Sequence, residues 1–201
     1  MATTDDSHER QHPRTVDSVS QPSQAQPGTA GERPQFVIQR HAASTDHYDF
    51  RLEVEGTLKS WSVPKGPSID PAQKRLALPT EDHALDYADF EGTIPNGDYG
   101  AGTVLIWDRG TYTNTTVEQG HEVSMSHGLH QGHVSFRLHG DKLDGGYALN
   151  RIRRGSDEAW LLVKERDEAA DAGDEPTTRP ESVRTGRDID EVARDDEAEQ
   201  Q

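Results

Sequence analysis

Residues 47–54 alternate strictly between polar and apolar side chains, and this stretch constrains the fold of the chain more than any other. The apolar side chains at every second position are Tyr48, Phe50, Leu52 and Val54. The polar side chains between them are His47, Asp49, Arg51 and Glu53. Because successive side chains of a β-strand point to opposite faces, this period predicts a strand with one buried face and one exposed face.

Similar short segments follow one another along the chain, separated by residues that favour turns. Strands are predicted at 36–39, 47–54, 57–63, 74–78, 103–107, 111–113, 134–139, 146–153 and 160–165. Turns are predicted at Glu55-Gly56 and at Asp108-Arg109-Gly110, and a short helix is predicted within 115–128. Many short strands at regular spacing predict an all-β, mainly antiparallel fold, either a barrel or a sandwich.

The two ends of the chain differ in composition from its middle. Apolar residues make up only 30% of the chain and charged residues 29%, so part of it is expected to lack a packed core. Residues 1–35 are rich in Ser, Gln, Pro and Thr without periodicity, and residues 166–201 contain thirteen acidic and five basic side chains. We therefore expect a disordered N-terminal tail at 1–35, one folded domain at 36–166 and an acidic disordered C-terminal tail at 167–201.

Charge and cysteine content argue against several classes of protein. The net charge is −16, and half of that excess falls in residues 166–201. Binding to nucleic-acid phosphates depends on basic groups, so only a local cationic cluster would support it in such an acidic chain. The chain has no cysteine, which excludes disulfides and thiolate metal sites. No apolar run approaches the ~18 residues of a membrane helix, and no signal-peptide pattern is present, so a cytoplasmic, soluble protein is expected.

His47 and Asp49 share the polar face of the predicted strand, roughly 6 to 7 Å apart along it. His41, which precedes His47 by six residues, can return from the preceding segment as a third ligand. Two histidines and one carboxylate form a facial triad, which leaves coordination positions open for water or substrate, as a catalytic metal requires. The competing interpretation is a strand with a hydrated polar face and His41 in a loop.

Further polar and cationic side chains recur near the predicted sheet ends. They are Arg51, Lys65 in a Pro-Lys-Gly-Pro loop, Arg75, the Glu81-Asp82-His83 element, and Tyr87. Together with a metal ion they suit a phosphoryl group, because cations spread its negative charge and histidine exchanges protons near neutral pH. Each also has a structural alternative. These alternatives are an Arg51 ion pair with Asp49 or Glu53, a solvated Lys65 or Arg75, and a turn capped by His83.

Several longer motifs resemble one known family. They are Gln39-Arg40-His41, residues 47–53 (His-Tyr-Asp-Phe-Arg-Leu-Glu), residues 58–67 (Leu-Lys-Ser-Trp-Ser-Val-Pro-Lys-Gly-Pro), Glu81-Asp82-His83, residues 86–92, residues 99–104, and residues 160–164 (Trp-Leu-Leu-Val-Lys). With these motifs, residues 35–166 closely resemble the 3′-phosphoesterase domain of bacterial DNA ligase D and its stand-alone relatives. Residues 181–187 resemble the linker that follows this domain in the fused enzymes.

The resemblance implies a small β-barrel with short helices and a manganese-dependent hydrolase that heals DNA 3′ ends. It would remove a terminal ribonucleoside as a phosphodiesterase and then the exposed 3′-phosphate as a phosphomonoesterase, leaving a 3′-hydroxyl. By matching motif positions, Mn²⁺ would be held by His41, His47 and Asp49. The phosphate would be faced by Arg51, Lys65, Arg75, His83 and Tyr87. Catalysis would depend on His83, Arg51 and Tyr87, with Glu81 orienting neighbours or a metal-bound water.

The resemblance also implies partners. These are DNA or RNA–DNA primer-template 3′ ends, and separate ligase, polymerase or Ku-type proteins of non-homologous end joining. No membrane partner is expected.

Two other functions fit parts of the pattern. His47 and Asp49 with the distal His127 and Arg137 also match the iron and 2-oxoglutarate oxygenases, which are β-barrels too. That template gives no role to His41, however. A module that binds nucleic-acid ends without turnover would require the same polar pocket. A second metal site among the histidines at 121, 127, 130 and 133 would need a helix, which Gly128 and Gly132 disfavour, so hydrated loop histidines are favoured.

Overall fold

The computed structural model describes residues 33–98 and 100–199, and within these ranges strands predominate. The strands are β1 (Gln35–Ala42), β2 (Asp46–Val54), β3 (Thr57–Val63), β4 (Lys74–Pro79), β5 (Gly92–Ile94), β6 (Gly102–Asn114), β7 (Val117–Glu118), β8 (His121–Glu122), β9 (His133–Gly140), β10 (Asp144–Arg153) and β11 (Ala159–Lys164). The helices are the 3₁₀-helices η1 (Leu85–Asp89) and η2 (Pro176–Thr178) and the α-helices α1 (Met125–Gln131) and α2 (Ile189–Glu199). None of the helices in the described ranges combines the length and apolar character needed to cross a bilayer.

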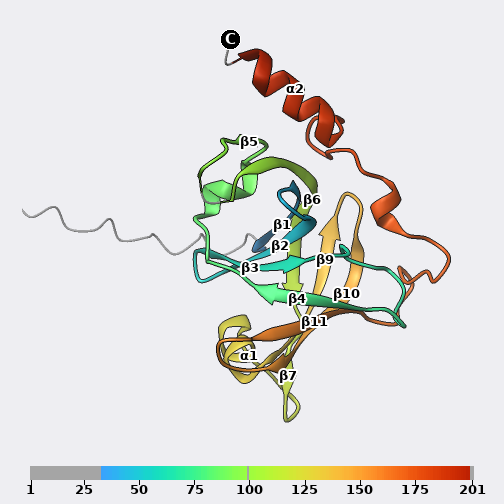
Figure 1. The fold of residues 1–201 in the computed structure, drawn as a ribbon. Coiled ribbons are helices and arrows are strands. Elements are labelled where there is room, and N and C mark those ends of the chain that lie inside the picture. Colours follow the sequence, from blue (N-terminus) through green and yellow to red (C-terminus); the bar gives the residue numbers. More distant parts are fainter. Residues whose placement is uncertain (1–32, 99, 200–201) are drawn as a thin grey trace, which may run out of the picture.

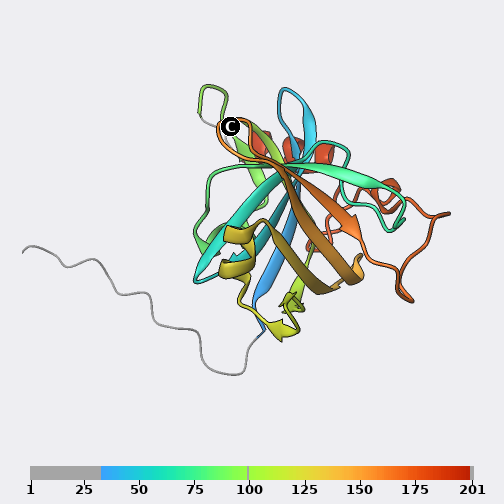
Figure 2. The same cartoon turned by 90° about the horizontal axis from the view of Figure 1, so that it is seen from below.

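Eight of the described strands close into a barrel, in the order β1-β2-β3-β4-β11-β10-β9-β6, with β6 pairing back onto β1. Every pairing in this ring is antiparallel. Figures 1 and 2 show the strands wrapping around a common interior, with β5 added beside β6 and α1 at the opposite end of the barrel from α2. The prediction of an all-β, mainly antiparallel barrel with short helices is confirmed.

The alternation in β2 decides which side chains lie inside the barrel. Tyr48, Phe50, Leu52 and Val54 are buried in the main core. There the Phe50 ring lies 5.8 Å from the Phe136 ring, and Tyr48 meets Trp107 edge-to-face at 5.3 Å. The hairpin from β2 to β3 reverses at Glu55 and Gly56, both with positive φ, as predicted. The polar side chains of β2 consequently project from the outer surface of the barrel.

A smaller apolar cluster lies on that outer surface and attaches a covering segment to it. The cluster consists of the buried Val37, Leu58, Ala88 and Ile106, with Leu85, Tyr87 and Val183 packed against them. Leu58 and His83 also exchange two backbone hydrogen bonds of 2.9 and 3.0 Å. Residues 81–94, which include η1, are thereby held across the outer faces of β1 to β3.

The turn predicted at 108–110 is wrong, because β6 continues through it. The pairing of β1 with β6 shifts register here, with Ile38 opposite Asp108 and Gln39 opposite Ile106, which leaves Trp107 as the extra residue of a β-bulge. The Asp108 carboxylate is fully buried and accepts hydrogen bonds of 2.9 Å from the backbone N–H groups of Arg109, Asp141, Lys142 and Leu143. It therefore organises the distant connection between β9 and β10 and makes no local turn.

The short helix lies a few residues later than predicted. Residues 117–122 form the β7–β8 hairpin, and α1 begins only after Ser124, whose hydroxyl accepts the N–H of His127 at 3.1 Å. Gly128 and Gly132 do not prevent this helix. Gly132 ends it in the left-handed conformation, at φ 97°, which glycine adopts without strain.

The expectation of a disordered tail does not hold for residues 167–199, which pack along the barrel. Ile189 and Val192 join the main core, and the Trp107 indole N–H donates to the carbonyl of Arg179 at 2.8 Å. The residues that make these contacts are few among the many charged residues of this segment, so its composition alone predicts disorder. The folded unit therefore extends beyond residue 166. The tail predicted at 1–35 lies outside the described residues up to residue 32, and β1 begins at Gln35.

Replacing Asp108 with Asn should destabilise the barrel. The two Asp108 oxygens accept from four N–H groups, and an Asn side chain would turn an NH₂ group toward at least one of them. We expect the free energy of unfolding to fall by about 1–3 kcal/mol, measured by urea titration. The control is Asp141→Asn, which changes an exposed side chain in the same connection. Equal stability of the two variants would contradict the role assigned to Asp108.

Candidate metal centre and active-site pocket

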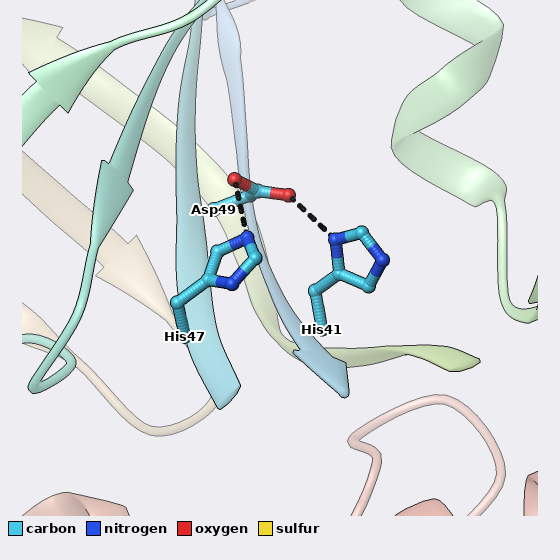
Figure 3. A group of neighbouring side chains, drawn as sticks. All are labelled: His41, His47 and Asp49. Carbon is cyan, nitrogen blue, oxygen red and sulfur yellow. Dashed lines mark ion pairs between the residues drawn. The ribbon is translucent and has the colours of Figure 1, made fainter. Parts of the chain in front are cut away.

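His41, His47 and Asp49 converge at the adjoining ends of β1 and β2. His41 lies directly opposite His47 in the register, and Asp49 follows on the same face of β2. His41 Nδ1 is 3.7 Å from one Asp49 carboxylate oxygen, and His47 Nε2 is 3.6 Å from the other (Figure 3). One potential ligand atom from each residue lies within 4.8 Å of the other two. The predicted triad is therefore assembled in space.

The donor set fits a divalent cation. Contacts of 3.6–3.7 Å are too long for hydrogen bonds, so the three groups do not satisfy one another. His47 Nδ1 lies 2.8 Å from the Thr45 carbonyl and must be its donor, which leaves Nε2 of the neutral ring as a lone-pair ligand. His41 Nε2 is buried without a hydrogen-bond partner. A cation among His41 Nδ1, His47 Nε2 and the Asp49 carboxylate would fill the space between these three donors.

The charges of the triad support the same interpretation. Burial alone would raise the pKa of Asp49, but the His41 and His47 imidazoles and the Arg51 guanidinium hold it well below its usual range. Asp49 is therefore ionised at neutral pH. The contact with Asp49 raises the pKa of His47 despite partial burial.

Arg51 joins the triad to the strands on either side. Its side chain is only 3% exposed. It donates to Asp49 at 3.0 Å, to the side-chain oxygen of Gln39 on β1 at 2.8 Å, and to the Ser60 hydroxyl on β3 at 2.8 Å. Since Gln39 and Ser60 lie opposite Asp49 and Arg51 in the register, the alternation of three neighbouring strands builds this network.

His83 and Tyr87 reach the same network from the covering segment. His83 Nδ1 lies 3.0 Å from Arg51 Nη1 and 2.8 Å from the Glu81 carbonyl. Nδ1 must accept a hydrogen bond in the contact with Arg51 and donate one in the contact with the Glu81 carbonyl. The two contacts therefore correspond to different tautomers of the ring. The Tyr87 ring lies 5.0 Å from the guanidinium carbon of Arg51 and 4.6 Å from the His83 ring. Burial, followed by the charge of Arg51, lowers the pKa of His83, and burial raises the pKa of Tyr87.

A pocket of about 280 Å³ brings together most of the side chains predicted to act on phosphate. Its lining includes His41, His47, Asp49, Arg51, Glu81, His83 and Tyr87. Thr80 also lines it. The side-chain oxygens of Gln39 and Ser60 accept hydrogen bonds from Arg51. Sequence reasoning missed Gln39, Ser60 and Thr80. Extending the two-residue alternation from β2 to its neighbours would have identified Gln39 and Ser60.

Lys65 and Arg75 do not line this pocket. Lys65 is exposed on the loop after β3. Arg75 shares the inward-facing side of β4 with the buried Ala77 and makes a 2.8 Å ion pair with Glu175. Of the three cations predicted around the phosphate, the pocket therefore contains Arg51.

The alternative triad of the oxygenases is not assembled. His127 is exposed on α1 and pairs with Glu118 at 2.8 Å, and Arg137 pairs with Glu168 at 2.6 Å. Neither side chain lines the pocket that contains His47 and Asp49. Within the described residues, the triad of His41, His47 and Asp49 is the single group of three or more side chains with metal-ligand geometry, and it includes none of the histidines of α1.

Comparison with known proteins identifies the family. Residues 39–151 match the model of the DNA ligase D 3′-phosphoesterase domain. The chain is 53% identical over 156 residues to the multifunctional non-homologous end joining protein LigD of Pseudomonas aeruginosa, which covers 76% of this chain and 18% of that protein. It is 45% identical over 148 residues to the multifunctional non-homologous end joining DNA repair protein LigD of Mycobacterium tuberculosis, covering 74% of this chain and 18% of the relative.

The LigD protein of Mycolicibacterium smegmatis is 41% identical over 138 residues, which is 69% of this chain and 18% of that protein. The chain thus spans less than a fifth of the length of each of these relatives. The matched region contains every side chain of the pocket described above. The chain belongs to the DNA ligase D 3′-phosphoesterase domain family.

Proposed function

We propose that this chain is a metal-dependent phosphoesterase that restores 3′-hydroxyl groups at DNA ends. It would remove a 3′-terminal ribonucleoside as a phosphodiesterase and a 3′-phosphate as a phosphomonoesterase. One observation carries the proposal: the triad of possible metal ligands shares a single pocket with Arg51, His83 and Tyr87 in a member of this family. These are the groups that hydrolysis of a phosphoester needs.

His41, His47 and Asp49 would hold the cation, which we propose to be Mn²⁺. Imidazole and carboxylate ligands also suit other divalent metals, so the choice of manganese depends on the family resemblance. When bound, the ion would supply Lewis-acid polarisation of the phosphoryl group. The buried Asp49 would remain ionised to hold it, since its pKa lies well below the usual range.

The remaining side chains of the pocket have complementary roles. Arg51 is fixed by Asp49, Gln39 and Ser60, so its charge would stabilise the developing negative charge of the phosphoryl oxygens without first having to reorganise. Tyr87 stays protonated at neutral pH because burial raises its pKa, and its phenol would donate to a phosphoryl oxygen.

His83 is the candidate proton donor. Its lowered pKa keeps the imidazole neutral near pH 7. A neutral ring whose Nδ1 accepts from Arg51 keeps its proton on Nε2. Transfer of a proton to the leaving oxygen would require the imidazolium form, which the lowered pKa makes a minor species at pH 7. The alternative role is a hydrogen bond to the phosphate without proton transfer.

Glu81, Lys65 and Arg75 have weaker structural support. In the tautomer with a proton on Nδ1, the Glu81 backbone carbonyl accepts from His83 at 2.8 Å and would orient the ring. We propose that Lys65, exposed after β3, contacts substrate phosphate outside the pocket. Arg75 would have to leave Glu175 to do the same.

The substrates would be DNA or RNA–DNA primer-template 3′ ends. The relatives are named for non-homologous end joining, and we propose that this chain acts in the same process. Separate ligase, polymerase or Ku-type proteins would then be its partners.

Removal of His47 should abolish end healing. We expect His47→Ala to release terminal ribonucleoside and phosphate at least ~100-fold more slowly than the unmodified chain, because a metal ligand is lost. The assay uses a primer-template with a 3′-ribonucleotide or a 3′-phosphate, with Mn²⁺ or with EDTA. The matched control is His127→Ala, which should retain full activity. Full activity of His47→Ala, or activity in EDTA, would refute the proposal.

Metal binding can be tested without any substrate. Titration calorimetry of the unmodified chain with Mn²⁺ should give one site, and Asp49→Asn should weaken its binding by at least ~10-fold because a charged ligand becomes a neutral amide. Asp46→Asn, on the same strand but paired with Arg40, is the control. An unchanged Kd for Asp49→Asn would exclude the triad as the Mn²⁺ site.

A further inference from the structure

Residues 182–187 form a turn that packs against the segment covering the pocket. The side chain of Val183 joins the outer apolar cluster, which also contains Leu85 and Tyr87. The Val183 N–H donates to the carbonyl of Ile106 on β6 at 3.0 Å. The turn therefore contacts both the barrel and the covering segment.

The turn is closed by its own hydrogen bonds. The Ser182 hydroxyl accepts the N–H groups of Arg184 and Thr185 at 3.1 and 3.2 Å. The Ser182 N–H donates to the Arg187 carbonyl at 2.8 Å, and the Gly186 N–H donates to the Ser182 carbonyl at 2.9 Å. Gly186 has φ 74°, a conformation that glycine adopts without strain. The turn is therefore a defined structure, although the surrounding sequence is highly charged.

Glu91 joins this turn to the covering segment. Its side chain is only 2% exposed. One carboxylate oxygen accepts from Ile106 N–H at 2.9 Å and from the Ser182 hydroxyl at 2.5 Å. The other accepts from the Thr185 hydroxyl at 2.6 Å and from Arg187 at 3.2 Å. Although burial opposes its charge, these four donors lower the pKa of Glu91, so the carboxylate remains ionised.

The covering segment is therefore fixed from two sides. On the barrel side, the Gln39 amide donates to the carbonyls of Tyr87 and Phe90 at 3.0 and 2.9 Å, while its oxygen accepts from Arg51. On the outer side, Glu91 is held by the turn, and Arg184 donates to the carbonyl of Asp89 at the end of η1. The backbone of Tyr87 is part of the barrel-side attachment, and the outer attachment at Asp89 follows two residues later.

We infer that the turn at 182–187, acting through Glu91, positions Tyr87 and, through the 4.6 Å contact between the two rings, His83 beside the proposed metal ligands. Glu91 and Arg187 are positioning residues, because neither lines the pocket. The proposed metal ligands lie on β1 and β2, whereas the hydrogen bonds of the turn described above go to β6 and to the covering segment. The catalytic part of the inference rests on the proposed phosphoesterase function.

The test compares Glu91→Ala, Arg187→Ala and Arg187→Lys in the full chain. We expect kcat for phosphate release to fall ~10- to 100-fold in the two alanine variants, because small displacements of reacting groups cost this much. Arg187→Lys should recover most of kcat, since lysine retains the charge facing Glu91. The control is Asp195→Asn, which removes the exposed carboxylate that pairs with Arg187 at 2.8 Å and leaves the Glu91 contact in place.

Two further measurements separate positioning from loss of the fold. The Kd for Mn²⁺ in both alanine variants should stay within about twofold of the unmodified value, as expected where no ligand is moved. Amide hydrogen exchange should accelerate in residues 83–94 and remain unchanged in residues 36–54.

Unchanged kcat in both alanine variants would overturn the inference, and so would a parallel loss of Mn²⁺ binding. If the unmodified chain released no phosphate, the proposed function would fail. The hydrogen-exchange comparison would then still decide whether the turn holds the segment, and unchanged exchange in residues 83–94 would refute it.

Discussion

The buried pair of Arg51 and Asp49 is the interaction on which the site depends. Both side chains are nearly inaccessible and lie 3.0 Å apart on the same face of β2. Two charges can be removed from water in this way only if each is paired and hydrogen-bonded. Gln39 and Ser60 satisfy Arg51 from the two flanking strands, and the imidazoles of His41 and His47 surround Asp49. The candidate metal centre and the candidate phosphate site therefore share one electrostatic network.

Barrel closure makes this network possible. The apolar half of β2 fills the interior, so its polar half must face outward, where an open surface would hydrate the charges. The outer apolar cluster prevents this by attaching residues 81–94 over β1 to β3. The same attachment brings His83 and Tyr87 to Arg51 from outside the barrel. The covering segment thus buries the charged network and supplies two side chains to the pocket.

The amino-acid sequence predicts those features that repeat with a local period. The alternation at 47–54 predicts β2 and places His47 and Asp49 on one face, and the structure confirms both. Asp108 was misread because Asp-Arg-Gly resembles a turn locally, whereas its hydrogen-bond donors include residues more than thirty positions away. Arg75 is predicted at the phosphate from its place near a sheet end and from the family resemblance, whereas its ion-pair partner Glu175 lies a hundred residues later in the chain. The packing of residues 167–199 depends on a few apolar and hydroxyl side chains. The overall composition of this segment is dominated by charged residues and therefore does not reveal them.

The most direct test of this account is an anomalous difference map from crystals soaked in MnCl₂. The account predicts one manganese peak within bonding distance of His41, His47 and Asp49, beside the guanidinium of Arg51. A peak at other side chains, with these three left uncoordinated, would contradict it.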